Sequence, residues 1–220
     1  MGIEVFAYAS AIGGIELDRD SFSPDERDNN PFAMPDAGAA ERIKEYADKK
    51  LEECNSMGGI IECVVKNMPT GIGEPVFEKL DANLAKAVMS IGAIKGVEIG
   101  DGFRAAQSTG LGNNDAFRIR DGRVVKATNH SGGILGGMSD GSDIILRAAV
   151  KPTPSIAAVQ QTVNRQGEEI DISIHGRHDP MIVPRAVVVV EAMTALTLVD
   201  MLFMGMTSRL DRIVDFYKNR

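Results

Sequence analysis

The sequence predicts a mixed helix-and-strand fold of the α/β (α+β) type, in a single domain over residues 1–220. Strand-like and helix-like segments alternate through the first hundred residues, and a buried strand and a long apolar helix follow nearer the end. The 220 residues include 44% apolar and 25% charged side chains, an ordinary globular composition that can fill a sizeable core.

The first strand, loop and helix follow one another from the N-terminus. Residues 3–11 have the β-branched and aromatic side chains of a strand, and the Asp-, Asn- and Pro-rich stretch 21–35 is typical of a loop. From residue 43 to 54 apolar side chains recur every three or four positions, which predicts a helix that ends before Gly58-Gly59. Residues 60–66 are then predicted to form a strand.

A second helix is predicted from the apolar stripe that runs from Phe77 to Ile91. The chain enters it through Glu74-Pro75, and residues 94–99 return as a strand. The next stretch, 100–141, is dense in Gly, Asn and Asp, with short extended pieces near 117–126. Irregular regions of this length are usually functional or disordered.

The last third contains two predicted strands and a helix. Residues 144–150 form an apolar run typical of a buried strand, and the isoleucines of 170–174 alternate with polar residues as in a half-buried one. The segment 181–206 is unusually apolar, but a membrane span needs about 20 uncharged residues. Because charged residues interrupt it, we expect a buried helix from about Pro184, suited to a subunit interface. These residues are Arg185, Glu191 and Asp200.

Charge and cysteine usage exclude several classes of protein. The net charge of −7 argues against a nucleic-acid-binding or anionic-membrane surface. Cys54 and Cys63 have no second pair and no neighbouring histidine, so neither a metal site nor a disulfide framework is expected, and a cytoplasmic location fits best. The first residues have neither the basic stretch nor the apolar core of a signal peptide and enter a strand at once, from which we expect a truncated chain.

Glycines cluster between residues 129 and 141. Glycine lets the backbone take positive φ and approach a flat or charged ligand, as in phosphate and cofactor sites. The cluster matches neither the dinucleotide-binding fingerprint nor the P-loop. Close packing of glycine-rich strands is an equally good interpretation.

Two further segments carry polar side chains suited to chemistry. The segment 151–155 combines a lysine, two hydroxyls and two prolines and would suit an anion, although a strand-ending turn with a solvated lysine is the simpler interpretation. In 176–180, Arg177, His178 and Asp179 together can bind an anion and move a proton. Alternatively, Asp179 caps the following helix and Arg177 pairs with a surface carboxylate.

Five segments, in this order, resemble the signatures of the chorismate synthase family. They are colinear and spread over residues 71–180, half of the chain, which makes the resemblance far more specific than any one match. They are Gly71–Phe77 with Leu80-Asp81-Ala82, Lys95–Phe103, the glycine cluster, Lys151-Pro152-Thr153 and Gly176–Pro180. The resemblance implies a sandwich of β-sheets around helices, assembled as a homotetramer.

The resemblance also implies a function. It is that of a carbon-oxygen lyase, which catalyses the anti 1,4-elimination of phosphate from 5-enolpyruvylshikimate-3-phosphate to give chorismate in the shikimate pathway of aromatic amino acid biosynthesis. Reduced FMN is required but not consumed, and NADPH is a candidate reductant for the flavin. The protein would then supply positioning and electrostatics around the flavin, without nucleic acid or membrane as a partner.

Site residues can be carried over by position from the family. Asp179 falls where the family has an aspartate near flavin N5, proposed to help deprotonate flavin or substrate. Gly92 and Pro154 depart from the family pattern, because some relatives have Asn and many have Ser there. The positions that fall on FMN contacts are Gly92, Ala93, Gly136, Lys151, Pro152, Thr153, Pro154, Ser155 and Arg177.

The family's N-terminal third has no counterpart in this sequence. That third carries both catalytic histidines and the arginines that bind substrate, so we expect the chain alone to be inactive. His130, His175 and His178 do not replace the missing histidines. A different class of function remains open, in which the chain is a catalytically silent FMN-binding or assembly fragment.

Overall fold

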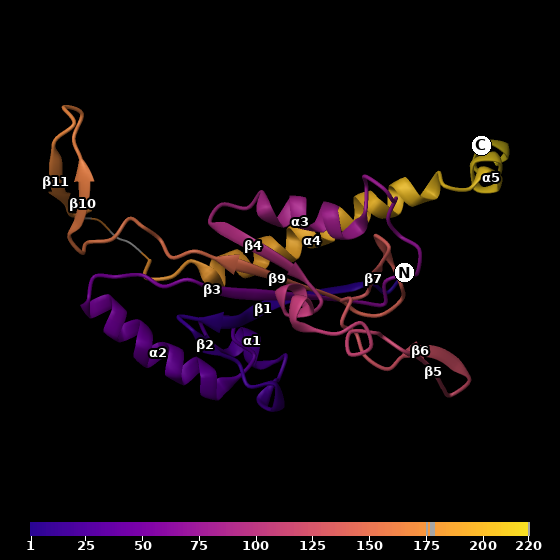
Figure 1. Cartoon of the computed structure of the whole chain (residues 1–220), viewed down its shortest axis with the longest axis horizontal. Coiled ribbons are helices and arrows are strands. Elements are labelled where there is room, and N and C mark those ends of the chain that lie inside the picture. The colour runs from indigo at the N-terminus through magenta and orange to yellow at the C-terminus, as the bar shows by residue number, and fades with distance from the viewer. Residues whose placement is uncertain (175, 177–178, 220) are drawn as a thin grey trace.

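A five-stranded antiparallel sheet forms the centre of the computed structural model, which describes residues 1–174, 176 and 179–219. The strand order is β2-β1-β3-β9-β4, and every neighbouring pair is antiparallel (Figure 1). The strands are β1 (Glu4–Ile12), β2 (Ile15–Glu16), β3 (Gly59–Lys66), β4 (Ile94–Ile99) and β9 (Ile144–Val150). The predicted strands in the first hundred residues and at 144–150 are confirmed.

Strand β9 lies between β3 and β4 in the sheet, although it begins about 50 residues after β4 begins. Val150 is the register partner of both Gly59 on β3 and Ile94 on β4. Ile12, at the end of β1, also pairs with Gly59. One end of the sheet therefore collects the last residues of β1 and β9 and the first residues of β3 and β4. The antiparallel pairing makes the fold α+β.

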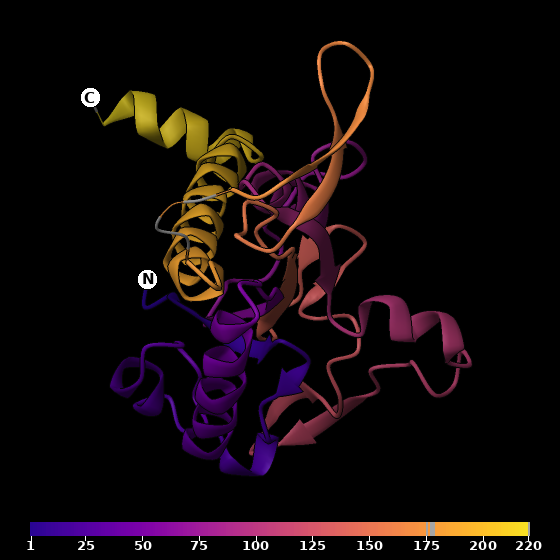
Figure 2. The same ribbon diagram turned by 90° about the vertical axis from the view of Figure 1, so that its left-hand side faces the viewer.

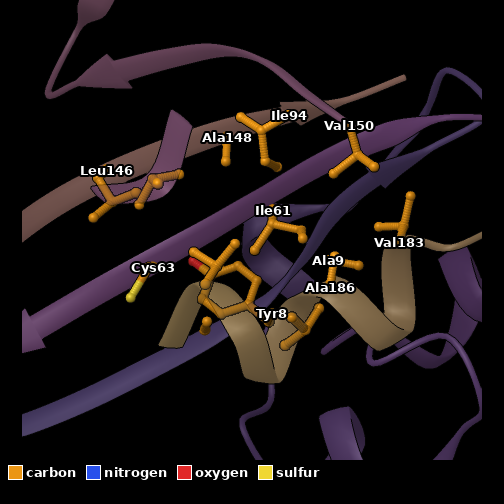
Figure 3. Close-up of a cluster of buried hydrophobic side chains, with 14 of the residues drawn as sticks. Tyr8, Ala9, Ile61, Cys63, Ile94, Leu146, Ala148, Val150, Val183 and Ala186 are labelled. Atoms are coloured by element: carbon orange, nitrogen blue, oxygen red, sulfur yellow. The ribbon is translucent and has the colours of Figure 1, made fainter. Parts of the chain in front are cut away.

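Helices cover one face of this sheet. Helices α3 (Leu80–Met89) and α4 (Val183–Met206) pack against it, α4 lying over β1 and β3. Figure 3 shows the resulting core, with Ala9 and Ile61 of the sheet near Val183 and Ala186 at the start of α4. A helix is confirmed in the region predicted after residue 43, but α2 (Ala37–Glu52) begins six residues earlier, and its buried residues are Ala39, Ala40, Ile43 and Ala47. The later members of the predicted stripe are not buried, because Leu51 is 59% exposed and Cys54 is exposed beyond the end of the helix.

Helix α3 begins three residues later than its apolar stripe suggested. Glu74 and Glu78 exchange two backbone hydrogen bonds of 2.9 Å, closing a turn before the helix starts at Leu80. Phe77 lies in this turn and is 90% exposed, so its assignment to the buried stripe was wrong. The turn uses the residues that the periodicity had counted as the first helical turn.

Helix α4 is buried on one side only, which corrects the expectation of a buried helix. Only 28% of its most apolar 18-residue stretch is buried. By length and composition alone it could cross a membrane, but one such helix is weak evidence, and its inner side packs on the sheet. An exposed apolar stripe, which we call the outer seam, follows spacings of three and four. It consists of Val189, Ala192, Leu196, Val199, Phe203 and Met206.

Smaller elements project from this body. The hairpin β10–β11 and helix α5 (Leu210–Lys218) extend from opposite ends of α4 (Figures 1 and 2). Ile170 and Ile172 on β11 are each 41% exposed, and all four residues of this strand are exposed. The strand lies outside the main sheet, so the expectation of a half-buried strand with one covered face was wrong. The other small elements are α1 (Glu26–Asn29), β5 (Phe117–Arg120), β6 (Arg123–Lys126), β7 (Ile134–Leu135), β8 (Met138–Ser139), β10 (Gln160–Val163) and β11 (Glu169–Ile172).

Candidate functional site

The predicted cofactor segments 92–93 and 151–155 meet at the end of the sheet where β9 finishes. The Lys151 backbone N–H donates to the Ala93 carbonyl oxygen over 3.0 Å. The contact follows from the register, because Ala93 and Lys151 directly flank the paired residues Ile94 and Val150. Ala93 itself adopts a positive φ of 71°. Two segments about 60 residues apart in sequence thus form one surface.

Thr153 lies at the centre of the loop Lys151–Ser155, which we call the cofactor loop. Its carbonyl oxygen accepts a hydrogen bond of 2.6 Å from the Ser56 hydroxyl. Its own hydroxyl oxygen is buried and has no hydrogen-bond partner among the described residues. A buried hydroxyl in this state costs about 1–3 kcal/mol, so it marks a place where an acceptor would be favourable. Lys151, by contrast, is exposed.

Asp179 forms an ion pair with Arg185 in the first turn of α4. An Arg185 Nη2–H donates to the Asp179 Oδ1 atom over 3.1 Å, and the Asp179 side chain is 38% exposed. The residue preceding α4 is Ile182, and no side chain of the described residues caps the helix there. The alternative interpretation of Asp179 as the helix cap therefore does not hold.

A small cavity joins Asp179 to the continuation of the cofactor loop. Its volume is about 120 Å³, and its lining includes Cys54, Ile156, Ala157 and Asp179. Asp179 and the chain that follows Ser155 thus face the same space.

Two of the predicted site residues are not placed in this region. Gly136 lies in the turn between β7 and β8, where the carbonyl oxygen of the next residue accepts from the Leu80 N–H over 2.8 Å. This glycine-rich segment packs at the beginning of β9, and the seven residues of β9 span about 20 Å. Gly136 is therefore well separated from Lys151. Arg177 lies outside the described residues.

A buried charged cluster at the base of the β5–β6 hairpin was not predicted. Lys126 Nζ forms an ion pair with Asp140, lies 3.7 Å from Asp115 Oδ2 and donates to the Ser131 hydroxyl over 3.1 Å. The two carboxylates and the lysine are at most 10% exposed. Burial opposes ionisation, but hydrogen bonds from Ser131, His130 and Thr128 hold the pKa of Asp115 well below its usual range. Only the density of Asp and Asn in this region hinted at such a cluster.

The sheet face away from α4 carries a second charged group that sequence analysis missed. Arg19 forms two hydrogen bonds to the Glu62 carboxylate, at 2.7 and 2.6 Å, and Tyr8 donates a third. Burial and the neighbouring Glu62 raise the pKa of Tyr8. Burial alone would raise the pKa of Glu62, but hydrogen bonds from Arg19 and Tyr8 lower it. The one available signal was a glutamate inside the apolar run of β3.

The fold and this end of the sheet define a class of protein. It is an α+β protein with an antiparallel sheet covered by helices on one face, and a loop that carries a lysine and a threonine lies at the end of that sheet. The family model for chorismate synthase matches residues 1–203. The chain belongs to the chorismate synthase family, as its five sequence segments had indicated.

Individual relatives agree with this assignment. The chain is 66% identical over 218 residues to the chorismate synthase of Lachnospira eligens, which covers 99% of this chain and 60% of that protein. It is 52% identical over 211 residues to that of Archaeoglobus fulgidus, with 94% and 59% covered. A crystal structure of chorismate synthase superposes with a TM-score of 0.74 at 28% identity, covering 99% of this chain and 62% of the other. The chain thus spans about 60% of the length of the relatives it matches.

Proposed function

We propose that this chain forms the FMN-binding part of a chorismate synthase, a lyase that eliminates phosphate in the anti 1,4 sense from 5-enolpyruvylshikimate-3-phosphate to give chorismate. The observation that carries the proposal is the junction of the cofactor loop with Ala93, beside a buried Thr153 hydroxyl that has no partner among the described residues. Membership of the chorismate synthase family supports assigning this reaction to the whole protein.

The residues at this junction fit a phosphate-bearing cofactor. A phosphate oxygen would accept the hydrogen of the Thr153 hydroxyl, and Lys151 would contribute a positive charge next to it. Pro152 and Pro154 fix φ on either side of Thr153 and so reduce the entropy lost when the loop binds. When bound, reduced FMN would lend electron density to the substrate as phosphate leaves and regain it afterwards.

Asp179 is the group proposed to move a proton. Its carboxylate is partly exposed, and the Arg185 guanidinium fixes its orientation. A positioned carboxylate of this kind can act as a general base towards flavin or substrate, a contribution typically worth about 10²–10⁴-fold.

The assembly and surroundings of the protein belong to the same proposal. We propose a homotetramer in the cytoplasm that uses neither nucleic acid nor membrane, with NADPH as a candidate source of electrons for the flavin. Because the chain spans about 60% of its relatives, we expect the 220 residues alone to bind FMN weakly and to form no chorismate.

FMN titration of the purified chain tests this proposal. Lys151→Ala should weaken FMN binding by roughly 10-fold or more, because a charge-assisted hydrogen bond contributes about 1.5–3 kcal/mol. Lys44→Ala, on the exposed side of α2, removes the same charge far from the site and should leave the affinity unchanged. Equal affinity of wild type and Lys151→Ala would reject the site. FMN binding together with chorismate formation by the isolated chain would contradict the expected inactivity.

A further inference from the structure

The segment Ser56–Gly58, between α2 and β3, contacts the cofactor loop through a side chain and through a close approach. The Ser56 hydroxyl donates to the Thr153 carbonyl oxygen over 2.6 Å, across 97 residues of sequence. Just before it, the Cys54 carbonyl oxygen accepts from the Ala158 N–H over 3.2 Å. The cofactor loop is therefore attached to this segment at its middle and just beyond its end.

Gly58 allows the two segments to lie this close. A Cβ atom at this position would sit 3.0 Å from the Pro152 backbone nitrogen and closer still to the Val150 carbonyl oxygen. Both neighbours are backbone atoms that cannot rotate away, so any larger residue would push the start of the cofactor loop outward. The Gly58 carbonyl oxygen also accepts from the Gly13 N–H over 2.9 Å, which ties the segment to the end of β1.

The same segment holds the chain next to Asp179. The Met57 N–H donates to the Pro180 carbonyl oxygen over 2.8 Å, and Met57 forms a parallel bridge with Met181. Met57 is only 4% exposed, so this bond is shielded from water. Residues 56 and 57 thus contact opposite sides of the candidate site.

No direct hydrogen bond joins the cofactor loop to residues 179–181 in the part of the chain that the structure describes. The described residues connect these two parts of the site by two hydrogen-bonded routes. One runs through Ser56 and Met57 and reaches Thr153 and Pro180 directly. The other joins the chain after the loop to the chain before residue 175, because the Ile174 N–H donates to the Ile156 carbonyl oxygen over 3.2 Å and the Ser173 hydroxyl donates to the Ala157 carbonyl oxygen over 2.6 Å. The route through Ser56 is the one that holds the middle of the loop, and a misplacement of about 1 Å can cost as much as 10²-fold in rate.

We propose that Ser56–Gly58 is the positioning element of the site, and that Ser56 is a positioning residue that sets the cofactor loop relative to Asp179. This inference rests on the proposed function, because it takes the loop as the FMN contact. The Ser56 hydroxyl touches neither cofactor nor substrate in this account. It acts by fixing the Thr153 backbone, and with it the direction of the Thr153 hydroxyl.

Ser56→Ala removes the hydroxyl and leaves the rest of the segment in place. We expect faster hydrogen exchange in peptides covering 151–158 and FMN binding weakened by about 2- to 10-fold, the effect of one neutral hydrogen bond. Ser56→Thr keeps the hydroxyl and should restore both quantities. Ser208→Ala is the matched control, because Ser208 also donates to a carbonyl oxygen, at 2.7 Å, but lies beyond the far end of α4.

The outcomes separate this inference from the proposed function. If exchange in 151–158 is the same in Ser56→Ala as in Ser208→Ala, the positioning role is rejected. If the wild-type chain binds no FMN, the proposed site is rejected for this chain, while the exchange comparison without ligand still decides the role of Ser56. If hydrogen exchange in Ser56→Ala is faster throughout the molecule, the variant is destabilised as a whole, and Ser56→Cys is measured instead. Cysteine keeps a side chain of similar volume but is a weaker hydrogen-bond donor.

Discussion

Cys54 and Cys63 lie nine residues apart in sequence but in opposite environments. Cys54 is exposed beside the small cavity that Asp179 lines, whereas Cys63 is fully buried on β3. Burial raises the pKa of the Cys63 thiol to about 12, so it stays protonated at neutral pH. Because the thiolate is the reactive form, the two cysteines should differ strongly in reactivity.

A thiol titration with a coloured disulfide reagent should therefore show one fast group in the native chain and two after denaturation. Cys54→Ser should abolish the fast reaction and leave one thiol that reacts only on unfolding. Two fast thiols in the folded wild type would mean that β3 opens far more readily than its burial indicates.

Individual site residues could be predicted from the sequence only where they belong to a segment that resembles the family. The resemblance assigned Lys151 and Ala93 to a cofactor site, an assignment that stays a prediction, and the structure adds the register that brings the two residues together. Ser56 was missed because a single serine that bonds to a carbonyl oxygen 97 residues away leaves no local pattern. Asp179 was named as a site residue by the resemblance, but its ion-pair partner Arg185 was seen only as an interruption of an apolar helix.

At the scale of an element, the hairpin β5–β6 depends on the buried cluster at its base. Asp115→Ala would leave Lys126 buried beside Asp140 with one of its two carboxylate neighbours lost. Removing one partner of a buried charged group typically costs about 3–5 kcal/mol. In urea unfolding, the free energy of unfolding of Asp115→Ala should be lower than that of the wild type by an amount approaching this size. Limited proteolysis should cut first within residues 115–140. Asp121→Asn, at the exposed tip of the same hairpin, should change neither.

The same cluster makes the hairpin sensitive to acid. The pKa values of Asp115 and Asp140 are lower in the folded chain than in the unfolded one. The two carboxylates therefore stabilise the folded chain fully above about pH 4. This stabilisation is lost as the pH falls through their pKa values in the folded state. A hairpin that stayed protease-resistant at the lowest pH where the core remains folded would contradict this assignment.

Elements with a long, regular pattern were predicted well, and elements defined by turns were not. The stripe of α2 gave a helix in the expected region, although only Ile43 and Ala47 of the predicted stripe are buried and the helix extends back to Ala37. The start of α3 was misjudged because the backbone pairing of Glu74 with Glu78 claims residues that also fit a helical period. The insertion of β9 between β3 and β4 leaves no trace in local periodicity, since any apolar strand could occupy that place.

For the whole molecule, the outer seam of α4 is the largest departure from an ordinary soluble surface. Leu196 and Phe203 are each 64% exposed, and their neighbours in the seam follow the three-and-four spacing of a helix–helix contact. Continuous apolar surface of this kind drives association in water. We expect the purified 220-residue chain to bind the dye ANS and to self-associate in sedimentation experiments.

Replacing Leu196 and Phe203 together by Gln should reduce both signals without a loss of thermal stability, because neither side chain is in the core. Val163→Gln on the projecting hairpin is the control, since Val163 is similarly exposed, at 63%, but outside the seam. A wild-type chain that remains monomeric and binds no ANS would contradict the expectation that the outer seam drives self-association.

The position of β9 also has a consequence during synthesis. About 50 residues separate the end of β4 from the end of β9, and a ribosome adds roughly 5–20 residues per second. Strand β4 therefore waits on the order of 2–10 s for β9, its one neighbour in the sheet among the described residues. Through that interval β3 offers one open edge and β4 offers two. Unpaired apolar strand edges are the surfaces that chaperones recognise and that aggregation uses. The nascent chain is thus most vulnerable between the translation of Ile99 and that of Val150.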